Sequence, residues 1–168
     1  LIMSGNVYVK QGLLDKALEK YKEALEINPG LGIAQLSISR IYVKLGKFNE
    51  AIDCLNSALK HNPQLEEARL ALAGIYQRMG DTDAALKELA GLVIRRPDSP
   101  QVQFQYAKLL VAREEFKQAI DACKKAIDLK PDSAFLHHML GRSYRGTGEY
   151  ELALREYAKA LEINPDMQ

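Results

Sequence analysis

Five prolines recur at a constant interval along this chain of 168 residues. Each ends a segment of similar sequence, as in Ala24–Pro29 and Ala160–Pro165, and successive members lie 34 residues apart, at Pro29, Pro63, Pro97, Pro131 and Pro165. A constant period of roughly 20–50 residues is typical of proteins built from repeated supersecondary units. The chain is therefore predicted to be a tandem array of one short unit.

Each unit contains two stretches with helical periodicity, separated by a turn. In the second unit, apolar residues recur at steps of three and four between Ile33 and Leu45 and again between Phe48 and Leu59. Gly46 interrupts the pattern, because glycine readily takes the left-handed conformation that ends a helix. Pro63 ends the second stretch, since proline has no amide hydrogen with which to continue a helix. The unit is thus predicted to be a helix hairpin.

The same pattern predicts ten helices and no strands over the whole chain. We expect helices near residues 1–11, 14–27, 31–45, 48–61, 65–79, 82–95, 99–112, 116–129, 133–146 and 150–163. The expected repeats form a single domain and cover residues 1–31 (incomplete at the N-terminal end), 32–65, 66–99, 100–133 and 134–167. The fourth repeat has Arg113-Glu114-Glu115 at the turn between its helices, so this turn must close without glycine. The incomplete first repeat leads us to expect a segment of a longer protein.

Small and aromatic residues follow the same period, and together they resemble the tetratricopeptide repeat family. One column of alanines, spaced like the prolines, contains Ala17, Ala51, Ala85, Ala119 and Ala153. The family pattern of glycine, tyrosine, alanine and proline is complete in the first repeat, at Gly5, Tyr8, Gly12, Ala17, Tyr21, Ala24 and Pro29. It is also complete in the fifth, at Gly141, Tyr144, Gly148, Ala153, Tyr157, Ala160 and Pro165. The resemblance implies an all-α solenoid, a right-handed superhelix of helix hairpins.

In this family the first helix of every repeat lines a concave groove, and the resemblance implies which residues would face it. The candidates for a peptide-binding groove are Asn6, Lys10, Ile33, Leu36, Arg40, Lys44, Leu70, Gln77, Arg78, Phe104, Lys108, Val111, Phe135, His138, Arg142 and Arg145. The groove positions include seven basic residues and one acidic residue, Glu67, so the rest of the chain holds 16 basic and 21 acidic residues. A cleft with one sign of charge concentrates ligands of the opposite sign.

These features favour a non-catalytic scaffold that binds a peptide, acidic and with apolar anchors, in a basic groove. One alternative is self-assembly, in which copies of the chain stack through apolar terminal repeats and form a homo-oligomer. The other is binding of single-stranded RNA, since basic grooves with aromatic residues can stack bases. A formal net charge of +1 argues against a globally basic nucleic-acid-binding protein.

Enzymatic and metal-dependent functions find little support in the sequence. The three histidines, His61, His137 and His138, and the two cysteines lack the spacings typical of zinc or di-iron sites. We therefore expect no catalytic residues, metal or cofactor. Apolar runs are too short for a membrane span, and the first residues do not resemble a signal peptide. A soluble protein is expected, and the sequence does not indicate its compartment.

Overall fold

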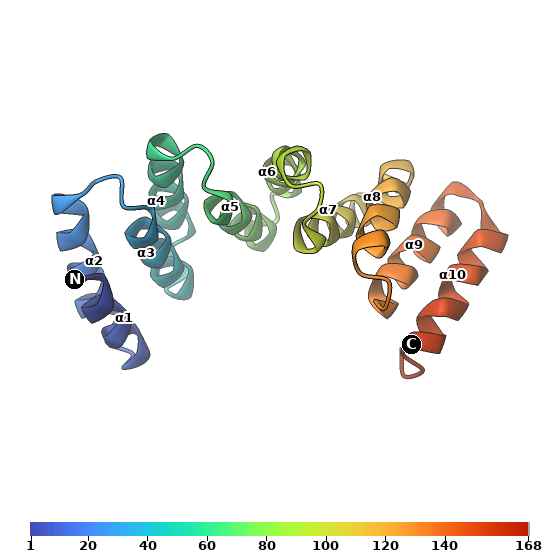
Figure 1. Ribbon diagram of the computed structural model, residues 1–168, viewed down its shortest axis with the longest axis horizontal. Coiled ribbons are helices and arrows are strands. Elements are labelled where there is room, and N and C mark those ends of the chain that lie inside the picture. Colours follow the sequence, from blue (N-terminus) through green and yellow to red (C-terminus); the bar gives the residue numbers. More distant parts are fainter. Residues whose placement is uncertain (168) are drawn as a thin grey trace. The chain divides into compact units, whose positions relative to one another are not determined.

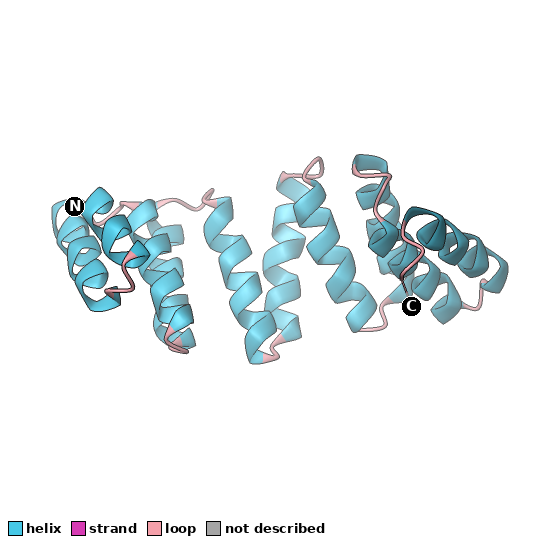
Figure 2. Ribbon diagram, turned by 90° about the horizontal axis from the view of Figure 1, so that it is seen from below, coloured by secondary structure: helices cyan, strands magenta, loops and turns pink. Residues whose placement is uncertain are grey.

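The computed structural model describes residues 1–167, and ten helices account for most of them (Figure 1). The helices are α1 (Ile2–Lys10), α2 (Leu14–Ile27), α3 (Gly32–Lys44), α4 (Phe48–His61), α5 (Glu66–Met79), α6 (Thr82–Arg95), α7 (Pro100–Ala112), α8 (Phe116–Leu129), α9 (Ala134–Thr147) and α10 (Tyr150–Ile163). Every predicted helix is present, with each end within one residue of its expected position. Residues 1–167 contain no strand (Figure 2). The prediction of an all-α fold is confirmed.

The described residues form two compact units, which divide at the turn between the helices of the third repeat. Unit 1 is Leu1–Asp81 and contains α1 to α5, whereas unit 2 begins at Thr82 and contains α6 to α10. Within unit 1 each helix packs against the next one, and α3 also contacts α5. Within unit 2 the same arrangement holds, and α7 also contacts α9. Contacts between the first helices of neighbouring repeats create the surfaces considered below.

The turns inside the hairpins use a left-handed residue in every repeat. Four of the five are glycines with φ between 73° and 85°: Gly12, Gly46, Gly80 and Gly148. In the fourth repeat Glu114 takes this conformation, with φ of 61°. The turn does close without glycine, as predicted, but it places a residue with a Cβ atom where that atom is disfavoured.

The small residues of the repeat pattern allow the two helices of a hairpin to approach closely. All five alanines of the column from Ala17 to Ala153 are buried. A Cβ atom at Gly5 would lie 2.5 Å from the Tyr21 ring, and one at Gly141 would lie 2.8 Å from the Tyr157 ring. Because core atoms are already close-packed, a side chain at either glycine would force the tyrosine to move.

A polar contact not predicted from the sequence ties the start of four first helices to the preceding loop. In each case a side chain near the helix start hydrogen-bonds the carbonyl of the proline six residues earlier, at 3.0–3.3 Å. The pairs are Gln35 with Pro29, Arg69 with Pro63, Gln103 with Pro97, and His137 with Pro131. These bonds give the carbonyl of each loop proline a hydrogen-bond partner. None of the helices described here is long and apolar enough to cross a membrane.

Candidate functional site

In unit 1, helices α3 and α5 border an open pocket of about 450 Å³, which we call the α3–α5 pocket. Its lining from α5 consists of Ala71, Gly74, Ile75 and Arg78. The last three lie three, four and seven residues after Ala71, so all four share one face of the helix. Helix α3 contributes Ser39, Arg40, Val43 and Lys44. The α3–α5 pocket thus combines apolar side chains with three basic ones.

A second pocket of about 160 Å³ lies on the other side of the same basic residues, between α1, α2 and α3. Arg40 and Lys44 line both pockets, so they stand between them. Asn6 also lines this second pocket, and its Oδ1 accepts a hydrogen bond of 2.6 Å from the hydroxyl of Tyr21. That bond fixes the side chain of Asn6, whose amide nitrogen can still donate to a ligand.

The α3–α5 pocket and the second pocket beside it have basic side chains and no acidic ones in their lining. Arg40, Lys44 and Arg78 are exposed, and none of them forms an ion pair with a carboxylate of the described chain. The guanidinium of Arg78 lies 5.8 Å from the centroid of the Phe48 ring, a cation–π distance that favours a fixed position. A ligand carboxylate would therefore meet cations that no protein carboxylate neutralises.

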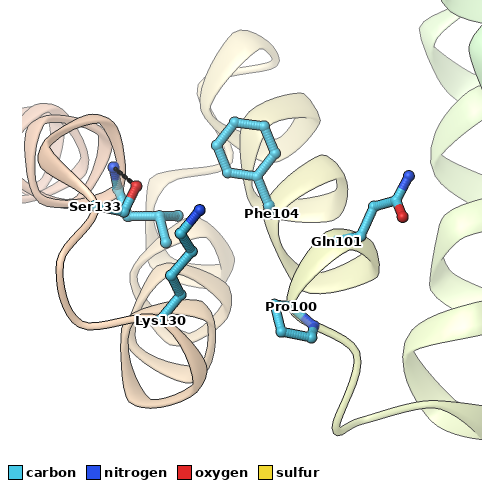
Figure 3. Close-up of a pocket in the computed structure, with 6 residues that line it drawn as sticks. Pro100, Gln101, Phe104, Lys130 and Ser133 are labelled. Atoms are coloured by element: carbon cyan, nitrogen blue, oxygen red, sulfur yellow. Dashed lines mark hydrogen bonds between the residues drawn. The ribbon is translucent and has the colours of Figure 1, made fainter.

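In unit 2, helices α7 and α9 and the loop before α9 form a pocket of about 340 Å³, here called the α7–α9 pocket. Figure 3 shows the Lys130 side chain extending from that loop toward the space between Phe104 and Ser133. Gln101 points away from Lys130 in the same view. The Phe104 ring lies 5.5 Å from that of Phe135, centroid to centroid. The α7–α9 pocket is therefore largely apolar, with a single ammonium group.

The structure gathers some of the predicted groove residues and separates others. Asn6, Arg40, Lys44 and Arg78 line the pockets of unit 1, and Phe104 lines the α7–α9 pocket. The other candidates that are exposed or half-buried lie outside these pockets: Lys10, Ile33, Leu70, Gln77, Lys108, Phe135, His138, Arg142 and Arg145.

Two predicted apolar anchors need correction. Leu36 has 8% of its surface exposed and Val111 only 3%, and each packs within a hydrophobic core cluster. Their side chains pack against other core residues between the helices. They stabilise the hairpins and are not available to a peptide.

Other pocket residues were missed by the sequence analysis. Ala71 and Ile75 could have been found from the sequence, because Ala71 lies three residues before Gly74 and Ile75 lies three residues before Arg78 on the same face of α5. Lys130 and Ser133 carry none, since they follow α8 in a loop, and only the packing of α7 beside α9 brings them to Phe104.

The described residues offer no side-chain cluster suited to metal binding, and Cys123 is not an activated thiol. They contain no group of three or more histidine, cysteine, aspartate or glutamate side chains that could hold a metal ion. Cys123 is buried, and burial raises the pKa of its thiol to about 12. A thiol with such a pKa is protonated at neutral pH and is a poor nucleophile.

Comparison with known protein families gives a consistent result for residues 8–167. Family models described as tetratricopeptide repeat match residues 8–64 and 46–109, residues 100–133, and residues 134–167. No curated protein sequence matches the chain.

Solved structures agree on the fold. A crystal structure of MamA is 24% identical and has a TM-score of 0.84, with 96% of this chain and 94% of that chain covered. A crystal structure of YrrB, described as a tetratricopeptide repeat protein with an unusual peptide-binding site, is 23% identical and also has a TM-score of 0.84. The aligned region covers 98% of this chain and 85% of the YrrB chain.

Proposed function

Because the chain belongs to the tetratricopeptide repeat family, we propose that it is a non-catalytic scaffold for protein–protein interactions and binds an acidic peptide segment with apolar anchors. Stacked helical repeats present extended surfaces of first helices that suit such a role. The unusual peptide-binding site of YrrB, similar in fold, is in keeping with a peptide ligand. The observation that carries the proposal is the unneutralised set of Arg40, Lys44 and Arg78 beside apolar lining.

The lining of the α3–α5 pocket is the reason for proposing that the peptide is acidic and has apolar anchors. Cations without carboxylate partners attract an acidic segment over a range set by the ionic strength, about 10 Å at 0.1 M salt. Apolar side chains of the peptide would add affinity by leaving water, at roughly 25 cal/mol per Å² of buried apolar surface. In unit 2, Phe104 and Phe135 are likewise suited to contact apolar side chains of a peptide.

The test uses a fluorescein-labelled peptide in which glutamates flank a leucine, and a second peptide with glutamine in place of every glutamate. We expect anisotropy titrations at about 50 mM salt to show binding of the acidic peptide that weakens as salt increases. Arg40→Glu and Lys44→Glu, both at residues that line the α3–α5 pocket, should each weaken it about tenfold or more, as reversal of a charge at an interface does. Lys60→Glu, an exposed lysine of α4, makes the same change in charge elsewhere and should have little effect.

The outcomes separate the alternatives. Equal binding of the glutamine peptide, or wild-type affinity in Arg40→Glu, would contradict the proposal. Binding of a labelled single-stranded oligonucleotide in preference to the acidic peptide would favour RNA. A mass that rises with concentration and falls back in Leu154→Glu, on the exposed face of α10, would favour self-assembly.

A further inference from the structure

We propose that the α3–α5 pocket receives one apolar side chain of the bound peptide and that Gly74 determines this preference by leaving the pocket open. This inference rests on the proposed function and specifies where one anchor of the acidic peptide lies. It concerns unit 1 alone, because every residue of the α3–α5 pocket belongs to α3 or α5.

Nothing in the packing around Gly74 requires a glycine. The residue lies in the interior of α5, and its backbone is not left-handed. A Cβ atom added there would have no atom within 4 Å apart from its chain neighbours and the nearby backbone of its own helix. Glycine in a helix interior costs about 1 kcal/mol of stability relative to alanine. Gly5 and Gly141 differ, since a Cβ atom at either would collide with a tyrosine ring. The missing side chain at Gly74 therefore leaves open space at the surface and contributes nothing to the core.

The open space is bounded by groups that suit an apolar side chain between two carboxylates. Val43, Ala71 and Ile75 provide apolar lining, and Ile75 itself is buried. Arg40 and Lys44 approach from α3, and Arg78 approaches from α5. An apolar side chain entering between them would lose contact with water while neighbouring carboxylates of the peptide pair with the cations.

The lining favours a peptide over a nucleic acid as the occupant. Single-stranded nucleic acids gain much of their affinity by stacking bases on aromatic side chains. No aromatic residue lines the α3–α5 pocket. Phe48 lies beneath the guanidinium of Arg78 and is engaged by it. The charge suits an acidic ligand of either kind, but the apolar lining suits an aliphatic side chain.

The experiment compares two acidic peptides that differ only at the central residue, leucine or alanine, between the same glutamates. The wild-type protein should bind the leucine peptide about tenfold more tightly, the effect expected from burying a leucine side chain in part. In Gly74→Leu the new side chain fills the α3–α5 pocket, so this preference should disappear while the alanine peptide binds as before. Gly91→Leu is the matched control, because Gly91 is also a helical glycine with open space at its Cβ position.

A measurement on the wild-type protein does not depend on how the variants fold. With a selectively labelled methyl group on Ile75, NMR titration with the leucine peptide should shift the Ile75 signal, and titration with the alanine peptide should shift it much less. Equal shifts with both peptides, or a leucine preference that persists in Gly74→Leu, would overturn the inference while leaving acidic peptide binding intact. Absence of binding by either peptide would instead overturn the proposed function.

Discussion

Glu114 is the residue at which the chain departs furthest from its own pattern. It takes a φ of 61° at a turn where the other repeats have glycine. A left-handed conformation costs a residue with a Cβ atom roughly 1–2 kcal/mol. The neighbouring Arg113 pairs with Asp83 and with Glu115, so ion pairs surround the turn and help to hold it.

We predict that Glu114→Gly stabilises the protein. Relief of the left-handed strain is partly offset by the greater freedom of glycine in the unfolded chain, which leaves a gain of about 0.5–1 kcal/mol in the free energy of unfolding. Urea denaturation followed by circular dichroism measures this change. Gly148→Glu is the reciprocal control and should destabilise the protein, because φ at that position is 85°. A loss of stability in Glu114→Gly would show that its side chain makes a favourable contribution larger than the strain.

At the level of elements, helices α9 and α10 are joined by a charged cluster that the repeat pattern does not contain. The Nδ1 atom of His137 lies 2.6 Å from one carboxylate oxygen of Glu156, and its Nε2 atom lies 3.1 Å from the carbonyl oxygen of Pro131. Both partners accept hydrogen bonds, so only the doubly protonated ring donates to both. Lys159 donates a hydrogen bond of 2.9 Å to the other oxygen of Glu156.

This cluster predicts a specific dependence of stability on pH. Burial raises the pKa of Glu156, but the hydrogen bonds and charges of Lys159 and His137 outweigh it and hold that pKa below its ordinary value of 4.5. A carboxyl group with a depressed pKa in the folded state stabilises the protein above its unfolded pKa, and the stabilisation is lost as the pH falls through the folded pKa. The free energy of unfolding should therefore decrease below a pH of about 4.5.

Substitution of Glu156 separates its contribution to the acid dependence of stability from the contributions of the other carboxylates. Glu156→Gln should be less stable than the wild type at pH 6 and should lose less stability between about pH 5 and pH 3. Glu151→Gln changes an exposed carboxylate of the same helix and should leave the acid dependence unchanged. Urea titrations at each pH measure the effect. An identical acid dependence in Glu156→Gln and the wild type would contradict the assignment.

At the level of the whole molecule, the two units each contain one free cysteine, which allows their opening to be measured separately. Cys123 lies in the core of unit 2, and burial raises the pKa of its thiol to about 12. Cys54 of unit 1 is only half-buried, and burial also raises its pKa. Under native conditions at pH 8 we predict that a thiol reagent modifies Cys54 well before Cys123, because Cys123 must wait for the core to open.

A destabilising substitution in unit 2 shows whether the units open independently. Gly141→Ala would force a Cβ atom against the Tyr157 ring and should cost about 1–3 kcal/mol, as overpacking does. If each unit opens by itself, labelling of Cys123 should accelerate by tenfold or more while labelling of Cys54 stays the same. An equal acceleration at both cysteines would show that the chain opens as one cooperative body. Mass spectrometry of tryptic peptides resolves the two sites.

The local sequence pattern was sufficient to predict the helices but was a poor guide to which side chains are exposed at the surface. A proline or glycine ends a helix through the conformation of its own backbone, so Pro63 and Gly46 marked helix boundaries whatever the tertiary packing. The family resemblance also implied that Arg40, Lys44 and Arg78 face one groove. It failed for Leu36 and Val111, because whether a side chain between two helices faces the core or the solvent depends on the angle and distance at which they pack.

By itself the sequence determined the repeat, its hairpins and its family, because these depend on intervals along the chain and on the conformational limits of glycine and proline. The tertiary structure showed which small residues meet which large ones, as with Gly5 against Tyr21 and Gly141 against Tyr157. Only the tertiary structure decided that Ala71, Gly74 and Ile75 of α5 lie beside Arg40 and Lys44 of α3. The reason is physical: a pocket is the space that two packed helices leave between them, and the sequence of neither helix specifies that space alone.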